Sequence, residues 1–502
     1  MTAPTPMTPQ QYIDETPTWK DGTQVSGAPM TAMQWRIWTL ATAGKFFEGM
    51  VVFMTGVALP LIVAEFQLGA MEKGVIGAAI LFGILIGATT LGGLADKYGR
   101  KRLFIAELIL FVFFLAALTI SPSFIFLALA LFGAGLALGC DYPTAHLVIS
   151  ESIPSRSRGK LVLGAFGFQA VGALVGTMIG FLVLYLSPEV GSWRYMYAVA
   201  IIPALLVIAG RFFINESPHW LMDKGHTAQA EHELGRLLER DPKYPSQIAL
   251  VKPPEEAEPE HERKQPGIKK LFKKKHRRAT IFASVPWFLQ DLGTYGIGIF
   301  TPIILVATFG HDTIGDDRNI ADLVENTLQS AKHAAFLDVL LIVGMLFAIF
   351  LTDKIGRIKL QIFGFIGCAI GLMLVAFSES LTGDMKLYLI FIGFMLFNFM
   401  TNLGPNAQTY LIAGEVFPTK IRGVGAGFAA SFAKIGAVGT AFLFPILLTD
   451  IGTAALLYIL AGTSILGAWV TWHYRIETRG ISLESIHHPQ TENVTVETKP
   501  IS

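Results

Sequence analysis

Long apolar runs constrain this chain more than any other feature of its sequence. There are twelve of them, and most reach about 20 residues, the length that an α-helix needs to cross a bilayer. The runs cover about residues 37–63, 74–94, 103–120, 124–149, 161–186, 195–214, 279–309, 333–352, 360–378, 387–413, 424–448 and 453–474. The predicted fold class is therefore an all-α membrane protein with twelve transmembrane helices.

Composition agrees with this class and excludes others. Of the 502 residues, 52% are hydrophobic and only 15% are charged, a balance that soluble proteins rarely show. The net charge of +1 gives no reason to expect a nucleic-acid partner. Cys140 and Cys368 both lie in apolar runs, where they are expected to pack rather than to form a disulfide or a metal site. The chain has no metalloprotease, serine-hydrolase or phosphate-loop motif, so neither an enzyme nor a cofactor is expected.

The distribution of Lys and Arg predicts the orientation in the membrane. Basic residues gather in the loops after spans 2, 4, 8 and 10, whereas residues 311–330 carry one Arg against five acids. Loops rich in Lys and Arg stay in the cytoplasm. Both termini are therefore predicted to be cytoplasmic, in a cell (inner or plasma) membrane. The first 34 residues show no signal-peptide pattern and are expected to be disordered.

A charged segment divides the apolar runs into two sets of six. The predicted parts are an N-terminal tail (1–34), a six-helix half (35–214), a cytoplasmic central loop (215–278), a second six-helix half (279–475) and a C-terminal tail (476–502). The loop ends in a basic cluster, residues 269–278, that is suited to anionic lipid headgroups. Its simpler role as an orientation signal is favoured.

The two halves repeat each other in two motifs. Asp-Lys-x-Gly-Arg follows span 2 and again span 8, and Glu-x-x-Pro with a later Arg-Gly recurs 264 residues further on. Such repeats place a central site at the interface of the halves, near the midplane. The charges are expected to pair at neighbouring helix ends and to latch one conformation, and the glycines to form tight turns. The predicted gating residues are Asp96, Gly99, Arg100, Glu151, Arg158, Asp353, Gly356, Arg357, Glu415 and Arg422. The alternative to a gating role is that the charges only set the orientation of the helices in the membrane and the glycines only form turns.

Ionisable residues inside apolar runs mark the predicted site. Glu48, Asp141 and Asp291 lie in runs with few neighbouring cations, which predicts proton coupling. Lys434 is the basic residue, suited either to an anion or to an acid across the bundle. A charge near the bilayer centre costs about 2.5–3.5 kcal/mol or more, so it is retained for ions, protons or substrate. The alternative for Asp291 is a position near a helix end, within reach of the headgroups.

One stretch of span 7 gathers several polar groups on one helix face. Trp287, Asp291 and Tyr295 are spaced i, i+4 and i+8, so a helix presents an indole N–H, a carboxylate and a phenol together. This face is expected to look into the bundle rather than at lipid.

The repeated loops resemble the signature of the major facilitator superfamily. Residues 216–221 and 476–484 look like segments of its sugar porters. Within the superfamily the chain is most similar to the proton-coupled phosphate symporters, through residues 139–143 of span 4, the polar face of span 7, residues 402–406 of span 10 and residues 433–437 of span 11. This similarity covers nearly the whole bundle.

The resemblance implies roles for individual residues. The implied substrate-binding residues are Tyr142, Gln169, Trp287, Asp291, Tyr295, Asn402, Asn406 and Lys434. Glu48, Asp141 and Asp291 are implied in proton coupling. Helix packing is the alternative for the aromatic residues, and interhelical hydrogen bonding for the amides. The chain departs from the phosphate family at Val51, where that family has a second acid, and at His146, which is expected to be a satisfied interhelical histidine.

These observations predict a secondary active transporter that works as a monomer. It would carry a small polar solute with protons by alternating access, with an anion such as inorganic phosphate as the main expectation. A proton-coupled sugar or organic-acid porter is the alternative within the class. A non-transporting nutrient receptor is the alternative from another class, but the short central loop and tail favour transport.

Overall fold

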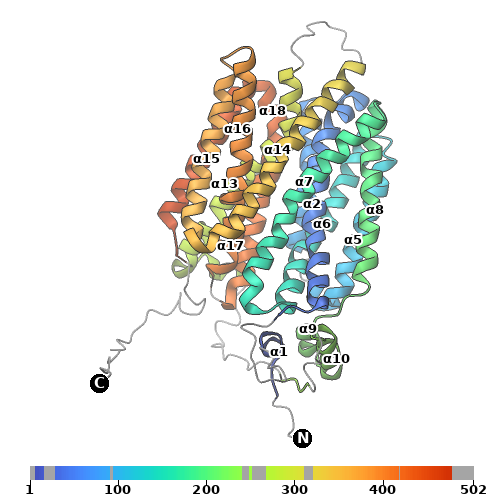
Figure 1. Ribbon diagram of the computed structural model, residues 1–502, viewed down its shortest axis with the longest axis vertical. Helices are drawn as coiled ribbons and strands as arrows, with labels where there is room; N and C mark the ends of the chain where they lie inside the picture. The colour runs from blue at the N-terminus through green and yellow to red at the C-terminus, as the bar shows by residue number, and fades with distance from the viewer. Residues whose placement is uncertain are drawn as a thin grey trace, which may run out of the picture.

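The computed structural model describes residues 6–15, 29–90, 94–239, 248–251, 267–309, 320–417 and 419–477. These residues are almost entirely helical, apart from connecting turns and one isolated parallel bridge between Met7 and Leu250. Figure 1 shows long helices side by side along the long axis, with the short helices α1, α9 and α10 gathered at one end. We call this end the loop end and the opposite one the far end.

The N-terminal half contains six long helices. They are α2 (Ala32–Phe66), α3 (Ala70–Thr90), α5 (Arg100–Thr119), α6 (Phe124–Ser152), α7 (Ser155–Leu186) and α8 (Trp193–Arg211). The short α4 (Leu94–Tyr98) precedes α5, and the 3-10 turn η1 (Val190–Ser192) precedes α8 at the far end.

The C-terminal half crosses the bundle six more times. Its helices are α13 (Lys274–Phe309), α14 (Ile320–Ile355), α15 (Arg357–Ser378), α16 (Asp384–Leu403), α17 (Pro405–Glu415) and α18 (Thr419–Tyr474). α16 and α17 form one crossing, bent at Gly404, where the following Pro405 has no N–H for the helix. α18 reverses at Gly452, whose φ of 80° suits glycine, so it supplies two crossings.

The predicted twelve crossings are therefore confirmed. Within the described residues, eleven helices are long and apolar enough to span a membrane. One of these, Ile421–Tyr474, has 54 residues. A helix of that length would measure about 80 Å, more than twice the roughly 30 Å of a bilayer core. The reversal at Gly452 resolves this mismatch.

Glycines let helices approach closely inside each half. A Cβ on Gly172 of α7 would lie 1.9 Å from the carbonyl oxygen of Phe46 on α2, and a Cβ on Gly135 of α6 would lie 2.0 Å from that of Ile80 on α3. Without water between them, membrane helices associate through such close packing rather than through the hydrophobic effect.

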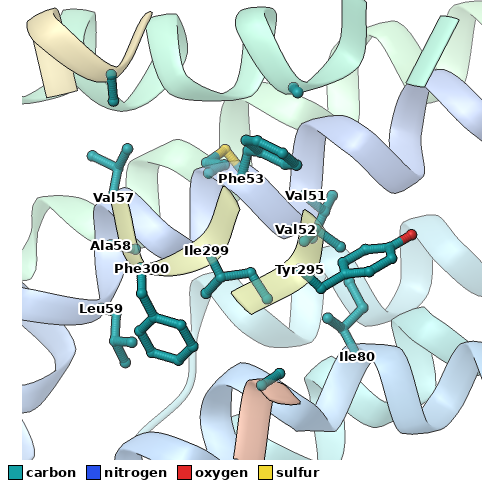
Figure 2. Packing of buried hydrophobic residues seen from close by; sticks show 14 of the residues in the cluster. Val51, Val52, Phe53, Val57, Ala58, Leu59, Ile80, Tyr295, Ile299 and Phe300 are labelled. Atoms are coloured by element: carbon teal, nitrogen blue, oxygen red, sulfur yellow. The ribbon is translucent and has the colours of Figure 1, made fainter. Parts of the chain in front are cut away.

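The two halves also pack tightly against each other toward the far end. A Cβ on Gly56 of α2 would lie 2.4 Å from the carbonyl oxygen of Ile299 on α13. Figure 2 shows the neighbouring apolar side chains, among them Phe53, Val57 and Phe300, filling the space between these helices. The far end is therefore closed by apolar contacts between the halves.

The N-terminal tail is folded where it is described, so the expectation of disorder is wrong there. α1 (Pro9–Asp14) begins with a capping box formed by Thr8 and Gln11. Tyr12 is only 2% exposed, and Asp14 Oδ1 accepts a hydrogen bond of 2.6 Å from the backbone N–H of Ser155 at the start of α7. Burial of the apolar face of α1 therefore orders this segment.

The central charged segment is also partly helical. It contains α9 (Pro218–Asp223), α10 (Thr227–Leu237) and α12 (Gly267–Leu271), and α13 begins at Lys274 within its basic cluster. Leu234 and Leu237 of α10 are fully buried in the same cluster as Tyr12 of α1.

Candidate functional site

A small cavity lies midway along the bundle, between the two halves. α2, α3 and α7 line it from the N-terminal half, and α13, α17 and α18 from the C-terminal half. Its lining residues are Lys45, Ile84, Ala88, Phe166, Gln169, Trp287, Asp291, Tyr295, Asn406, Ala430 and Lys434.

The polar face of α13 looks into this cavity. Trp287, Asp291 and Tyr295 all line it, as their i, i+4, i+8 spacing predicts. Asp291 is 2% exposed and lies in the middle of the helix, so the alternative of an Asp at a helix end is wrong.

Glu48 is surrounded by partners. Lys45 Nζ lies 2.5 Å from its Oε2, and Lys434 Nζ lies 3.1 Å from its Oε1. The Tyr295 hydroxyl donates a hydrogen bond of 2.8 Å to Oε1, and Gln169 Nε2 donates one of 3.4 Å. The expectation that Glu48 has few cationic neighbours is therefore wrong. Lys45 is only three residues away in the same run, so the sequence did contain this signal.

Asp291 is held much more weakly than Glu48. Its closest cation is Lys434, whose Nζ lies 3.6 Å from Oδ2, and this buried oxygen accepts no hydrogen bond. Lys434 is drawn instead to Glu48 and to the Tyr295 hydroxyl, to which it donates at 2.5 Å. Asp291 is thus the acid of the pair whose charge the protein compensates least.

The two asparagines divide their tasks. Asn406 lines the cavity and donates a hydrogen bond of 2.6 Å to Asn402 Oδ1. Asn402 is not in the lining, and its amide donates to the carbonyl oxygen of Leu341 at 2.8 Å. Asn402 thus makes the interhelical hydrogen bond given as its alternative, and its role in substrate binding stays a prediction. The side chain of Tyr142 lies outside the described residues.

A second small cavity lies toward the loop end. Lys45 and Phe166 belong to the walls of both cavities. The ring of Phe166 stacks on that of Tyr410 at 4.4 Å between centroids, and Trp287 meets Tyr410 edge-on at 6.0 Å. These three rings, the aromatic partition, lie between the cavities.

His146 is exposed in the wall of the second cavity, so its expected role as a satisfied interhelical histidine is wrong.

Asp141 also lines the second cavity and belongs to a buried triad. Arg211 Nη2 lies 2.6 Å from Asp141 Oδ1, and Arg211 Nη1 lies 3.1 Å from Glu107 Oε1. Arg211 is fully buried, and Glu107 Oε2 has no hydrogen-bond partner. Two carboxyls share one guanidinium here, so the expectation of few cations near Asp141 is wrong. The sequence analysis missed Glu107 and Arg211. Both are charged residues within apolar runs, and this alone marks them as candidate functional residues.

The duplicated motif has the same geometry in both halves. Arg100 contacts Asp96 at 2.8 Å and Glu151 at 3.1 Å. Gly99 has a φ of 102° as the N-cap of α5, a conformation that glycine adopts without strain.

In the second half, Arg357 contacts Asp353 at 3.3 Å and Glu415 at 3.1 Å. Gly356 repeats the φ of 102° as the N-cap of α15. In each half the arginine of the motif thus joins helix ends of its own half.

The remaining predicted gating residues bind locally. Arg158 Nη2 donates to Ser155 Oγ at 3.5 Å, and Arg422 Nε donates to the carbonyl oxygen of Phe417 at 3.3 Å. Lys160 and Asp353 make an exposed contact of 3.9 Å between the halves.

Comparison with known proteins now identifies the family. Residues 37–489 match the model of the family described as "Sugar (and other) transporter". The chain belongs to this family. It is 30% identical to the inner membrane metabolite transport protein YgcS of Escherichia coli K12, over 91% of this chain and 94% of that protein. It is 27% identical to a rice (Oryza sativa subsp. japonica) protein named as an inorganic phosphate transporter, over 82% of each.

Solved structures show the same fold. The partially occluded inward-open xylose transporter XylE of E. coli superposes with a TM-score of 0.70 at 20% identity, over 90% of this chain and 100% of that one. The fold is therefore that of the major facilitator superfamily, with two six-helix halves. The chain is a multi-pass membrane transporter of the sugar and metabolite type rather than an enzyme.

Proposed function

We propose that this protein couples the movement of a sugar or a small organic acid to protons by alternating access. The relatives support this substrate class over phosphate, which had been the main expectation. The family is that of sugar and other transporters, and its structural neighbour XylE is described as a proton:xylose symporter. Phosphate is named for a 27% identical rice protein and is kept as an arm of the test.

The observation that carries the proposal is the unequal pairing of Lys434. It lies closer to Glu48 than to Asp291, so Glu48 acts as a fixed counter-charge, while Asp291 is the acid that takes up and releases the proton. Burial favours the neutral form of an acid, and a neighbouring cation favours the charged form. A substrate that displaces Lys434 from Asp291 therefore promotes protonation of Asp291, so that substrate and proton bind together.

The charge count favours an anionic substrate within this class. With Lys45, Lys434 and Asp291 of the cavity wall and the adjoining Glu48 all ionised, the formal charges sum to zero. Protonation of Asp291 leaves one positive charge, which attracts a monocarboxylate. The amides of Gln169 and Asn406 and the Trp287 ring then contact the polar groups and the body of the substrate.

Orientation and gating follow from the same scheme. The basic loops predict that the loop end, and both termini, lie in the cytoplasm. The second cavity, with Asp141 and its triad, then forms the inner part of the pathway, and the aromatic partition closes the central cavity toward the cytoplasm. The duplicated arginine clusters hold helix ends rigid within each half while the halves rock against each other.

Uptake into vesicles containing the purified protein tests this function. An inward proton gradient should drive accumulation of at least one compound from a panel of pentoses, hexoses, monocarboxylates and inorganic phosphate, and a protonophore should abolish it. Accumulation driven only by a sodium gradient would overturn the coupling assignment. Accumulation of phosphate alone would overturn the substrate class.

A further inference from the structure

Asp338 is a further intramembrane acid, and it belongs to neither cavity. It lies within the apolar part of α14, is 5% exposed and lines neither cavity. Its Oδ2 lies 2.7 Å from the hydroxyl oxygen of Thr177 on α7. The contact therefore joins the C-terminal half to the N-terminal half.

Within the described residues, no basic side chain pairs with Asp338. α14 packs against α7, α16, α13, α2, α15 and α17. At this level α7 contributes Thr177, and α16 contributes Asn398, whose amide donates to the backbone oxygen of Leu337 at 3.0 Å. The basic residues of α7 lie at its loop end, more than ten residues from Thr177.

Lys332 of α14 is exposed, and several other titratable groups of these helices are engaged elsewhere. On α14 itself, the His333 ring lies against Phe391. The remaining engaged pairs are Lys45–Glu48, Glu65–Arg194, Asp291–Lys434, Tyr295–Glu48, Arg357–Glu415, Lys386–Glu379, Cys368–Phe397 and Tyr410–Phe166. An ionised Asp338 would therefore be a buried charge without a counter-charge.

The hydrogen bonds around Thr177 indicate where a proton sits. Its Oγ1 lies 3.1 Å from the carbonyl oxygen of Ala173 as well as 2.7 Å from Asp338 Oδ2. A hydroxyl has one hydrogen to donate, and a carbonyl oxygen only accepts. Both bonds are complete when Thr177 donates to Ala173 and a protonated Asp338 donates to Thr177.

We propose that Asp338 and Thr177 form a second proton site, which latches the far end closed. Proton binding neutralises Asp338 and completes its bond to Thr177 across the halves. When the far end opens, this bond breaks, water reaches the carboxyl and the proton leaves. The site rests on the proposed alternating access, but it is independent of substrate and of Asp291.

Accessibility of a cysteine at the far end tests the latch without any substrate. Cys140 and Cys368 are replaced by Ser, and Val57→Cys places one thiol in the closed apolar contact. The purified full-length protein in lipid nanodiscs is then treated with a charged maleimide between about pH 5 and about pH 9, a range that covers buried carboxyl groups. Rates are divided by those of an unfolded sample, which removes the intrinsic pH dependence of the thiol.

The corrected labelling rate should rise with pH in the parent. Asp338→Asn, which retains a donor for Thr177 but cannot ionise, should give slow labelling at every pH. Thr177→Val should raise labelling at low pH by about fivefold or more, the lower end of typical coupling, and Thr177→Ser should restore the parent profile. Asp322→Asn, at an exposed acid of the same helix, is the matched control and should change nothing.

Two outcomes would overturn the latch. One is a pH-dependent profile that survives in Asp338→Asn, and the other is labelling in Thr177→Val equal to that of the parent. The two proposals can fail separately. If uptake needs no proton gradient, the proposed coupling is refuted, but the labelling results can still support the second site.

Discussion

Glu48 and Asp291 share the cation Lys434 but have different surroundings. Glu48 is neutralised by two lysines and a phenol, while Asp291 has one lysine at 3.6 Å and an unbonded oxygen. An acid that is fully paired keeps its charge, whereas one that is buried and poorly paired can exchange a proton. In the proposed mechanism, the environment rather than the residue type therefore gives the coupling role to Asp291.

Asp291→Asn should separate binding from accumulation. Asparagine keeps a polar group at this position but cannot release a proton, so we expect substrate binding to persist with a flattened pH dependence and gradient-driven accumulation to be lost. Binding to purified protein between about pH 5 and about pH 8, together with vesicle uptake, measures both effects. A variant that accumulates substrate like the parent would show that Asp291 is structural. Asp384→Asn, at an exposed acid of α16, serves as the control.

Arg211 should be essential for stability. Arg211→Leu leaves Glu107 and Asp141 buried without a counter-charge, which should cost about 3–5 kcal/mol. Addition of Glu107→Gln and Asp141→Asn should recover much of this loss, because no buried charge then remains. Thermal unfolding in detergent measures both changes.

Arg194 offers a matched control for this series. It pairs with Glu65 at 2.6 Å, but both side chains are about a quarter exposed, so Arg194→Leu should cost only about 0–1 kcal/mol. Equal losses in the two arginine variants would contradict the assigned importance of burial.

At the scale of elements, close approach between helices decides which states the bundle can adopt. Gly172 of α7 packs against α2 within one half, and this contact can persist throughout transport. Gly56 of α2 packs against Ile299 of α13 across the halves, so this contact exists only while the far end is closed. A close glycine contact thus stabilises the fold of one half at Gly172, and the closed conformation of the far end at Gly56.

Gly56→Leu should hold the far end open. A Cβ at this position would lie 2.4 Å from a backbone oxygen that cannot rotate away, so the helices must separate. We expect slow uptake with retained folding, and faster labelling of Val57→Cys. Gly439→Leu on α18 is the control, since no atom lies within 4 Å of its added Cβ. Unchanged labelling in Gly56→Leu would show that this contact is absent from the gate.

At the scale of the whole molecule, the duplicated halves place the site and set its access. The central cavity draws residues from both halves, so their relative rotation changes its walls. The far end is sealed by apolar packing, whereas the second cavity extends toward the loop end. In the proposed transport cycle, this asymmetry means that the substrate next leaves the central cavity toward the loop end, where the basic loops lie.

Reporter fusions test that orientation. A fluorescent protein fused after residue 502 should be bright, and alkaline phosphatase there should be inactive, because the positive-inside rule places this end in the cytoplasm. Phosphatase inserted between α7 and η1, at the far end, should be active. The opposite pattern would invert the proposed direction of transport.

The sequence by itself determined the features that depend on local periodicity. Run length gave the twelve crossings, duplicated motifs gave two halves, and a spacing of four residues placed Trp287, Asp291 and Tyr295 on one face. Gly99 and Gly356 were expected in tight turns, and both have a φ of 102°. Each of these follows from backbone geometry within one segment, which neighbouring helices do not alter.

Only the tertiary structure decided which charges meet. Lys434 reaches Glu48 across 386 residues of sequence, and Asp338 reaches Thr177 across 161. Asn402 turns away from the cavity although its type suits a binding role. These contacts depend on the rotation of each helix about its axis and on the choice of its neighbours, which are fixed by how small residues let helices pack. That information is spread over the whole bundle, so no single segment reveals it.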